Sequence, residues 1–100
     1  VHLHNTRGAG AANLVAALQA GVTVFDASIG GLGGCPYAPG ATGNVSTEDM
    51  VHMLHEMGVD TGVDLWRLID TARALEGALG VPLTGQVIRA GVAYALSARG

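Results

Sequence analysis

Lysine is absent from this sequence of 100 residues, and cysteine occurs only once. Without lysine, the segment holds neither a Schiff-base nucleophile nor the lysine of a Walker-type phosphate loop. A single cysteine cannot form an internal disulfide, which fits a reducing cytosol. Any carbonyl chemistry done by these residues would therefore have to use a metal ion.

Positive charge and long apolar runs are scarce as well. Five basic and eight acidic residues give a net charge of −3, so no basic stripe is present to neutralise a phosphate backbone, and a nucleic-acid partner is disfavoured. The strongly apolar stretches, at residues 14–18 and 22–25, fall far short of the roughly 20 residues that span a bilayer. We expect neither nucleic acid nor membrane as a partner.

The start of the chain lacks an initiator methionine and lies inside the alternation Val1-His2-Leu3-His4. We interpret the sequence as the C-terminal part of a larger protein. A strand ending at His4, a helix over residues 11–20 with Gly21 just after it, and a β-branched strand over residues 22–27 predict a βαβ unit with parallel strands.

A Gly-, Pro- and Ala-rich loop follows at residues 28–46, and loops of that length are typical of functional sites. Ser46 is a favourable N-cap, Val45 and Met50 fit a hydrophobic staple, and the helix that begins there should end at Gly58. Further helices are predicted over residues 64–79 and 85–97, the first with an apolar stripe. Phe25 and Trp66 are interpreted as packing residues. The fold class is therefore α/β at the start and helical at the end.

Two histidines are the first candidate metal ligands. His2 and His4 are two residues apart on a predicted strand, so their side chains point to the same face. They also stand at the carboxyl end of that strand, where barrels and open α/β sheets place their active sites. The alternative is a pair of polar residues on an exposed strand.

The loop carries two more candidates. Cys35 lies between Gly34 and Pro36, where partial exposure and a nearby cation would lower the thiol pKa and make it an acid or a nucleophile; the alternative is an inert thiol. Asn44 offers an amide oxygen that suits Mg²⁺ or Mn²⁺, unless it is only a turn residue.

A second histidine pair, His52 and His55, lies on the helix that begins after Ser46 and has the spacing of metal ligands. These residues fall alongside Glu48 and Glu56 and opposite the apolar stripe of the same helix, so we interpret them as a solvated face. That stripe consists of Met50, Met53, Leu54 and Met57.

Three motifs together resemble the 3-hydroxy-3-methylglutaryl-CoA lyase family: residues 2–8 (HLHNTRG), residues 28–37 (SIGGLGGCPY) and residues 40–44 (GATGN). The resemblance extends to about residue 80. It implies a metal-dependent TIM (β/α)8 barrel, with the last strands and the cysteine loop in residues 1–58 and a C-terminal helical extension in residues 59–100.

The resemblance also implies roles for particular residues. His2, His4 and Asn44 would be ligands of Mg²⁺ or Mn²⁺, and Cys35 would take part in proton transfer. The fourth ligand, an Asp beside a catalytic Arg, and a catalytic Glu would lie outside this chain. Asn5 departs from the pattern, because lyases of this family often have Asp there.

The reaction implied is the retro-Claisen cleavage of 3-hydroxy-3-methylglutaryl-CoA to acetyl-CoA and acetoacetate, as in leucine degradation and ketone body metabolism. His2 is a candidate base, through a nitrogen that does not ligate the metal, and Cys35 the acid that protonates the enolate. An acyl-CoA thioester would be the substrate and a homodimer the assembly, in the cytoplasm or, in a eukaryote, the mitochondrial matrix. The alternatives are a related acyl-CoA lyase, a synthase that condenses acyl-CoA with 2-oxo acids, and a non-catalytic barrel remnant.

Overall fold

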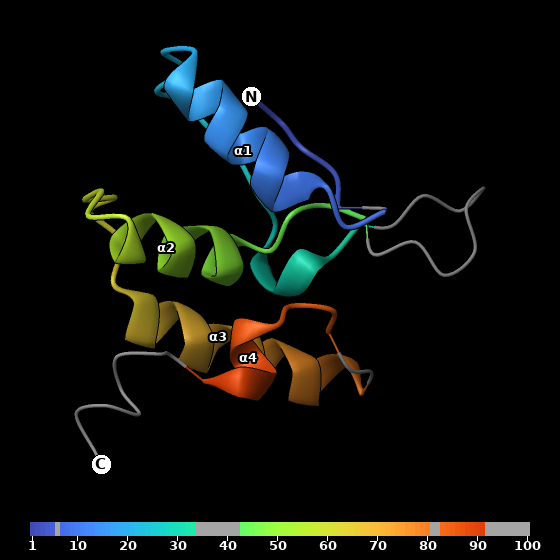
Figure 1. The fold of residues 1–100 in the computed structure, drawn as a ribbon. Coiled ribbons are helices and arrows are strands. Elements are labelled where there is room, and N and C mark those ends of the chain that lie inside the picture. Colours follow the sequence, from blue (N-terminus) through green and yellow to red (C-terminus); the bar gives the residue numbers. More distant parts are fainter. Residues whose placement is uncertain (6, 34–42, 81–82, 92–100) are drawn as a thin grey trace.

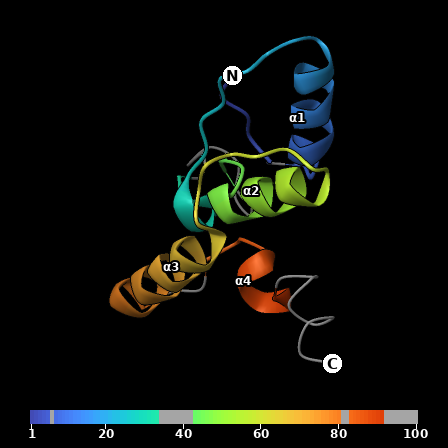
Figure 2. The ribbon, with the colours of Figure 1, turned by 90° about the vertical axis from the view of Figure 1, so that its left-hand side faces the viewer.

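The computed structural model describes residues 1–5, 7–33, 43–80 and 83–91, and every structural statement below refers to them. The elements are, in chain order, α1 (Gly10–Gln19), the 3-10 turn η1 (Ile29–Gly31), α2 (Thr47–Glu56), α3 (Leu65–Leu79) and α4 (Val87–Ala90). Figures 1 and 2 show α2 lying between α1 on one side and the pair of α3 and α4 on the other.

The first predicted helix is confirmed as α1, one residue earlier at each end. Gly21 follows the C-cap Ala20 with a φ of 93°, a left-handed conformation that glycine adopts without strain. Gly10 opens the helix against the start of α2, because a Cβ on it would lie 2.6 Å from Cγ2 of Val45.

The predicted strands appear only as isolated bridges among the described residues. His2 pairs with Asp26 in parallel, Ser28 pairs with Ser46 in parallel, and His4 pairs with Asn44 antiparallel. The parallel direction of the βαβ prediction is thus confirmed, but the strand over residues 22–27 is wrong in extent. Val24 in its middle is 75% exposed, and without neighbouring segments to hydrogen-bond along its length this stretch builds no continuous ladder.

The helices after the loop begin where the sequence predicts. Ser46 caps α2 and accepts from the Asp49 amide at 3.4 Å, and Asp64 caps α3 and accepts from the Arg67 amide at 3.2 Å. These caps satisfy amides that have no partner inside the helix. Of the third predicted helix, over residues 85–97, the described part holds α4 (Val87–Ala90), which ends at Gly91 with a φ of 80° that does not continue a helix. The rest of that prediction, residues 92–97, lies outside the described residues.

The core lies where α3 meets its neighbours, in two clusters. One joins α2, α3 and α4 through Val51, Leu65, Ile69 and Val87, and the other joins α3 and α4 to η1 through Ala72, Leu83 and Ile88. Trp66 is 45% exposed and stands next to the buried stripe of α3, so it is not a core residue. No described helix is long and apolar enough to cross a membrane.

Candidate metal centre

His2 and His4 project from one side of the extended segment at the start of the chain, as their spacing predicts. Their Nε2 atoms are 3.2 Å apart, and the ring centroids are 5.1 Å apart at an interplanar angle of 77°. Two ligands at right angles on an octahedral ion with bonds of about 2.1 Å would have their donor atoms roughly 3.0 Å apart. The two nitrogens therefore stand at a separation that one divalent ion could bridge.

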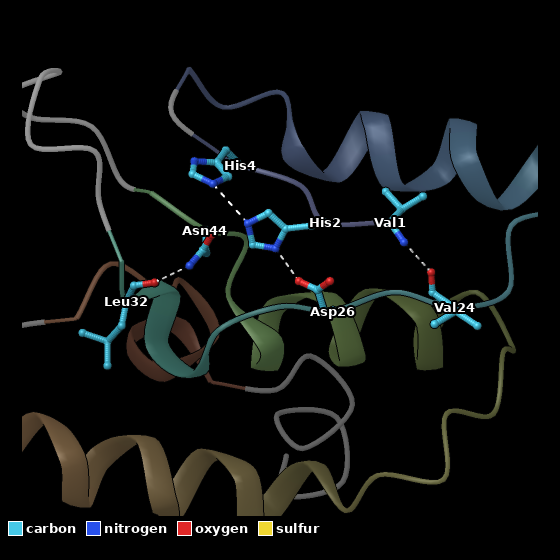
Figure 3. Close-up of polar contacts among 7 residues, drawn as sticks. All are labelled: Val1, His2, His4, Val24, Asp26, Leu32 and Asn44. Atoms are coloured by element: carbon cyan, nitrogen blue, oxygen red, sulfur yellow. Dashed lines mark hydrogen bonds and ion pairs between the residues drawn. The ribbon is translucent and has the colours of Figure 1, made fainter.

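Asp26 contacts the other nitrogen of His2, through Oδ1 and Nδ1 (Figure 3). A carboxylate accepts hydrogen bonds and does not donate them, so Nδ1 carries the proton and the lone pair is on Nε2, the atom that faces His4 Nε2 at 3.2 Å. This arrangement of carboxylate, imidazole and open nitrogen is the usual surrounding of a metal-ligating histidine. Sequence reasoning missed Asp26, because the contact joins residues 24 positions apart.

Asn44 lies beside His4, with which it forms the antiparallel bridge. Its Nδ2 donates to the carbonyl oxygen of Leu32 at 2.8 Å, while its Oδ1 is buried and has no hydrogen-bond partner. Gly33 packs against the same amide, since a Cβ on it would lie 2.7 Å from Asn44 Nδ2. The oxygen left without a partner is the atom expected to ligate, and an acceptor buried in this way is costly unless something occupies it.

Two imidazole nitrogens and an amide oxygen are a donor set that suits Mn²⁺ or Mg²⁺ in combination with a carboxylate. No group of three or more His, Cys, Asp or Glu side chains able to hold a metal ion is present in the described part of the chain. His2, His4 and Asn44 thus fit part of a binding site for a divalent metal ion, and their role as ligands stays a prediction. Cys35, the remaining predicted site residue, lies outside the described residues.

Asn5 has a local structural role. Its side-chain Oδ1 accepts a hydrogen bond from the Gly10 backbone amide at 3.0 Å, and the Asn5 backbone amide donates to the Gly43 carbonyl at 2.7 Å. These two bonds attach the segment that carries His2 and His4 to the start of α1 and to the residue preceding Asn44. Asn5 therefore helps to hold the candidate ligands together.

Glu48 is not on the solvated face where the sequence placed it. Its side chain is fully buried, with Oε1 accepting from the Gly30 amide at 2.8 Å and Oε2 lacking a hydrogen-bond partner. Helical periodicity could not reveal this, because Gly30 lies in a turn 18 residues away. On the same helix, His55 contacts Thr61 Oγ1 at 2.8 Å and His52 lies 3.9 Å from Glu56, so these two histidines face separate partners.

The HMGL-like family profile matches residues 1–75. A hydroxymethylglutaryl-CoA lyase of Bacillus subtilis is 55% identical over 83 residues, which are 83% of this chain and 28% of the relative. The (R)-citramalyl-CoA lyase of Chloroflexus aurantiacus is 51% identical over 94 residues, which are 94% of this chain and 30% of that enzyme.

Among solved structures, an HMG-CoA lyase from Acinetobacter baumannii in complex with coenzyme A and 3-methylmalate matches with a TM-score of 0.85 and 50% identity. The match covers 92% of this chain and 30% of that structure. The chain thus spans less than a third of the length of the relatives it matches. This chain and the matching part of that structure thus share one fold.

Proposed function

Because the chain belongs to the HMGL-like family, we propose that the protein containing it is a carbon–carbon lyase that cleaves 3-hydroxy-3-methylglutaryl-CoA to acetyl-CoA and acetoacetate. The observation that carries the proposal is the buried, unpartnered Oδ1 of Asn44 beside the paired histidines. We further propose that the chain supplies the last strands and the C-terminal helices of a TIM barrel, and that an Asp, an Arg and a Glu come from the rest of the protein.

A divalent ion, Mg²⁺ or Mn²⁺, is part of the proposal, with Nε2 of His2, Nε2 of His4 and Oδ1 of Asn44 as the ligands from this chain. When bound, such an ion would polarise the hydroxyl and carboxylate oxygens of the substrate. The histidine nitrogens are neutral donors and the amide oxygen is uncharged, so this chain contributes no negative charge to the ligand set. The charge of a bound ion would therefore be neutralised only by the substrate and by a carboxylate from the rest of the protein.

The proposed reaction needs one base and one acid. A base removes the proton of the tertiary hydroxyl, the C2–C3 bond breaks, and its electron pair becomes the enolate of acetyl-CoA as the ketone of acetoacetate forms. Cys35 is proposed as the acid that gives its thiol proton to the enolate carbon. The cysteine then leaves the step as a thiolate and recovers a proton from water, to which the base releases the proton that it took from the hydroxyl.

His2 is a candidate for both ligand and base, and the two roles compete. Asp26 occupies Nδ1, and Nε2 faces His4. A nitrogen that ligates cannot also accept the hydroxyl proton. We therefore propose ligation as the role of His2 during the reaction, with the base role open to His2 only when Nε2 is not bound.

A second candidate function has a specific observation in its favour. The (R)-citramalyl-CoA lyase is nearly as similar to this chain as the hydroxymethylglutaryl-CoA lyase, at 51% and 55% identity. Both names describe the cleavage of an acyl-CoA, so the two candidate functions differ in the acyl group of the substrate.

A substrate comparison tests the proposal. The full-length protein, supplied with Mn²⁺, is assayed for acetyl-CoA release from 3-hydroxy-3-methylglutaryl-CoA and from (R)-citramalyl-CoA. The proposal predicts a higher kcat/KM for the first compound. Faster cleavage of the second would replace the proposed substrate, and cleavage of neither would reject the lyase and favour a condensing synthase or a non-catalytic remnant.

A further inference from the structure

We infer that Asp26 is a positioning residue, which fixes the imidazole of His2 in the tautomer and orientation that present Nε2 to a divalent cation. The inference rests on the proposed function, because it assumes that His2 and His4 are ligands. Asp26 itself touches neither substrate nor metal in this account. It acts through the one contact that it makes with His2.

The contact defines the tautomer. Asp26 Oδ1 meets His2 Nδ1, so the ring proton of a neutral His2 sits on Nδ1 and the lone pair on Nε2. That lone pair points to the side where His4 Nε2 lies, 3.2 Å away. In water a free imidazole populates both tautomers, and only one of them leaves Nε2 able to ligate. Asp26 removes the wrong tautomer before any cation arrives.

The backbone places the carboxylate for this role. His2 and Asp26 are paired in a parallel bridge, and the Asp26 amide donates to the Val1 carbonyl at 3.0 Å. The Val1 nitrogen in turn donates to the Val24 carbonyl at 2.7 Å. These two bonds, of which Figure 3 draws the one between Val1 and Val24, fix the register of the two segments next to the side-chain contact of Asp26.

The chemistry of the pair points to metal ligation more than to stability. The side chains of His2 and Asp26 are 49% and 64% exposed, and a polar contact with that exposure contributes little to folding. A carboxylate on the far nitrogen does, however, make an imidazole a more basic ligand, and removal of such a partner typically costs about 10–100-fold in metal affinity. The expected loss is therefore in binding, with little change in folding.

Three variants of the full-length protein test the inference. Asp26→Asn keeps the size of the side chain and removes its charge, and Asp26→Glu restores a carboxylate. Asp70→Asn is the matched control, since Asp70 is an exposed residue of α3 that loses the same charge. Mn²⁺ affinity is measured by electron paramagnetic resonance of the free ion, and thermal melting of the metal-free proteins checks that each variant is folded.

The expected result is a Mn²⁺ affinity about 10–100-fold weaker for Asp26→Asn, an unchanged affinity for Asp70→Asn, and recovery toward the wild type for Asp26→Glu. A second readout is the His2 tautomer in metal-free protein, from long-range ¹H–¹⁵N spectra assigned with a His2→Ala variant. The wild type should carry its proton on Nδ1, and Asp26→Asn should show a mixture. A charge effect acting only at a distance would leave the tautomer unchanged.

Equal affinities and equal tautomers in Asp26→Asn and Asp70→Asn would overturn the inference and leave the proposed function intact. A loss as complete as that of His4→Ala would make Asp26 a ligand and overturn its positioning role. If the wild type binds no Mn²⁺, the proposed metal site fails, and this inference fails with it.

Discussion

Replacement of Glu48 by alanine should lower the free energy of unfolding, because it removes the hydrogen bond between the Glu48 side chain of α2 and the Gly30 amide of η1. The carboxylate is fully buried and accepts from the Gly30 amide at 2.8 Å. A hydrogen bond to a charged group contributes about 1.5–3 kcal/mol, and the one buried methylene group that alanine lacks adds about 0.8 kcal/mol. The unpartnered Oε2 offsets part of this, because its burial is costly. We expect a net loss of about 2–3 kcal/mol.

Gly30 makes this contact difficult to replace. Its φ is 65°, and a Cβ on it would lie 2.2 Å from Leu83 Cδ1, so the turn cannot shift toward the core to find another acceptor. In Glu48→Ala the Gly30 amide is left buried without a partner. Glu48→Gln keeps an oxygen at the Oε1 position and should cost about 1 kcal/mol.

The assay combines thermal unfolding with hydrogen exchange in the full-length protein. Glu48→Ala should lower Tm by at least about 4 °C and should speed exchange at the Gly30 amide. Glu48→Gln should do both to a smaller degree. The control is Glu56→Ala, because the Glu56 side chain is 44% exposed and lies 3.9 Å from His52. Equal losses for Glu48→Ala and Glu48→Gln would refute the reasoning, since the charge and not the acceptor would then matter.

Three more predictions concern the candidate site. His4→Ala should abolish stoichiometric Mn²⁺ binding, measured by isothermal titration calorimetry, because one of two paired nitrogens is lost; binding at wild-type affinity would exclude His4 as a ligand. Cys35→Ala should lower kcat much more than metal affinity, and equal losses in both would contradict the separation of acid and ligand roles. Asn44→Ala should weaken Mn²⁺ binding and also lower Tm, since it removes both Oδ1 and the bond to the Leu32 carbonyl; an unchanged affinity would leave Asn44 with a structural role alone.

Local rules predicted the helices well. The starts of α2 and α3 follow from Ser46 and Asp64, whose side chains cap the following amides, and the end of α1 follows from Gly21. Each of these signals acts within a few residues of the feature it predicts. The sequence therefore contained the information without any knowledge of the tertiary structure.

Contacts between distant segments could not be predicted in the same way. Glu48 looked solvated because its neighbours along the helix are polar, yet its partner is an amide in η1. The helix predicted over residues 85–97 is interrupted at Gly91, the residue at which α4 ends, and helical propensity alone did not identify that end. Both errors arise where tertiary contacts or backbone conformation override a local pattern.

The residues of the candidate site likewise differ in whether the sequence could predict them. The spacing of His2 and His4 predicted a shared face, and their Nε2 atoms do lie side by side. Asn44 was predicted from its amide oxygen in the glycine-rich loop and from the resemblance to a known family, and the fold brings it next to His4. Asp26 had no signal of its own, because only the parallel pairing with His2 brings its carboxylate to the ring.

The most direct test of the central claim is cleavage of 3-hydroxy-3-methylglutaryl-CoA by the full-length protein before and after removal of divalent ions. Acetyl-CoA and acetoacetate are quantified with the protein as purified, after treatment with EDTA, and after addition of Mn²⁺. The account predicts equal amounts of the two products, their loss on chelation, and their return with Mn²⁺. Cleavage that persists unchanged in the chelated protein would contradict the metal centre proposed for His2, His4 and Asn44.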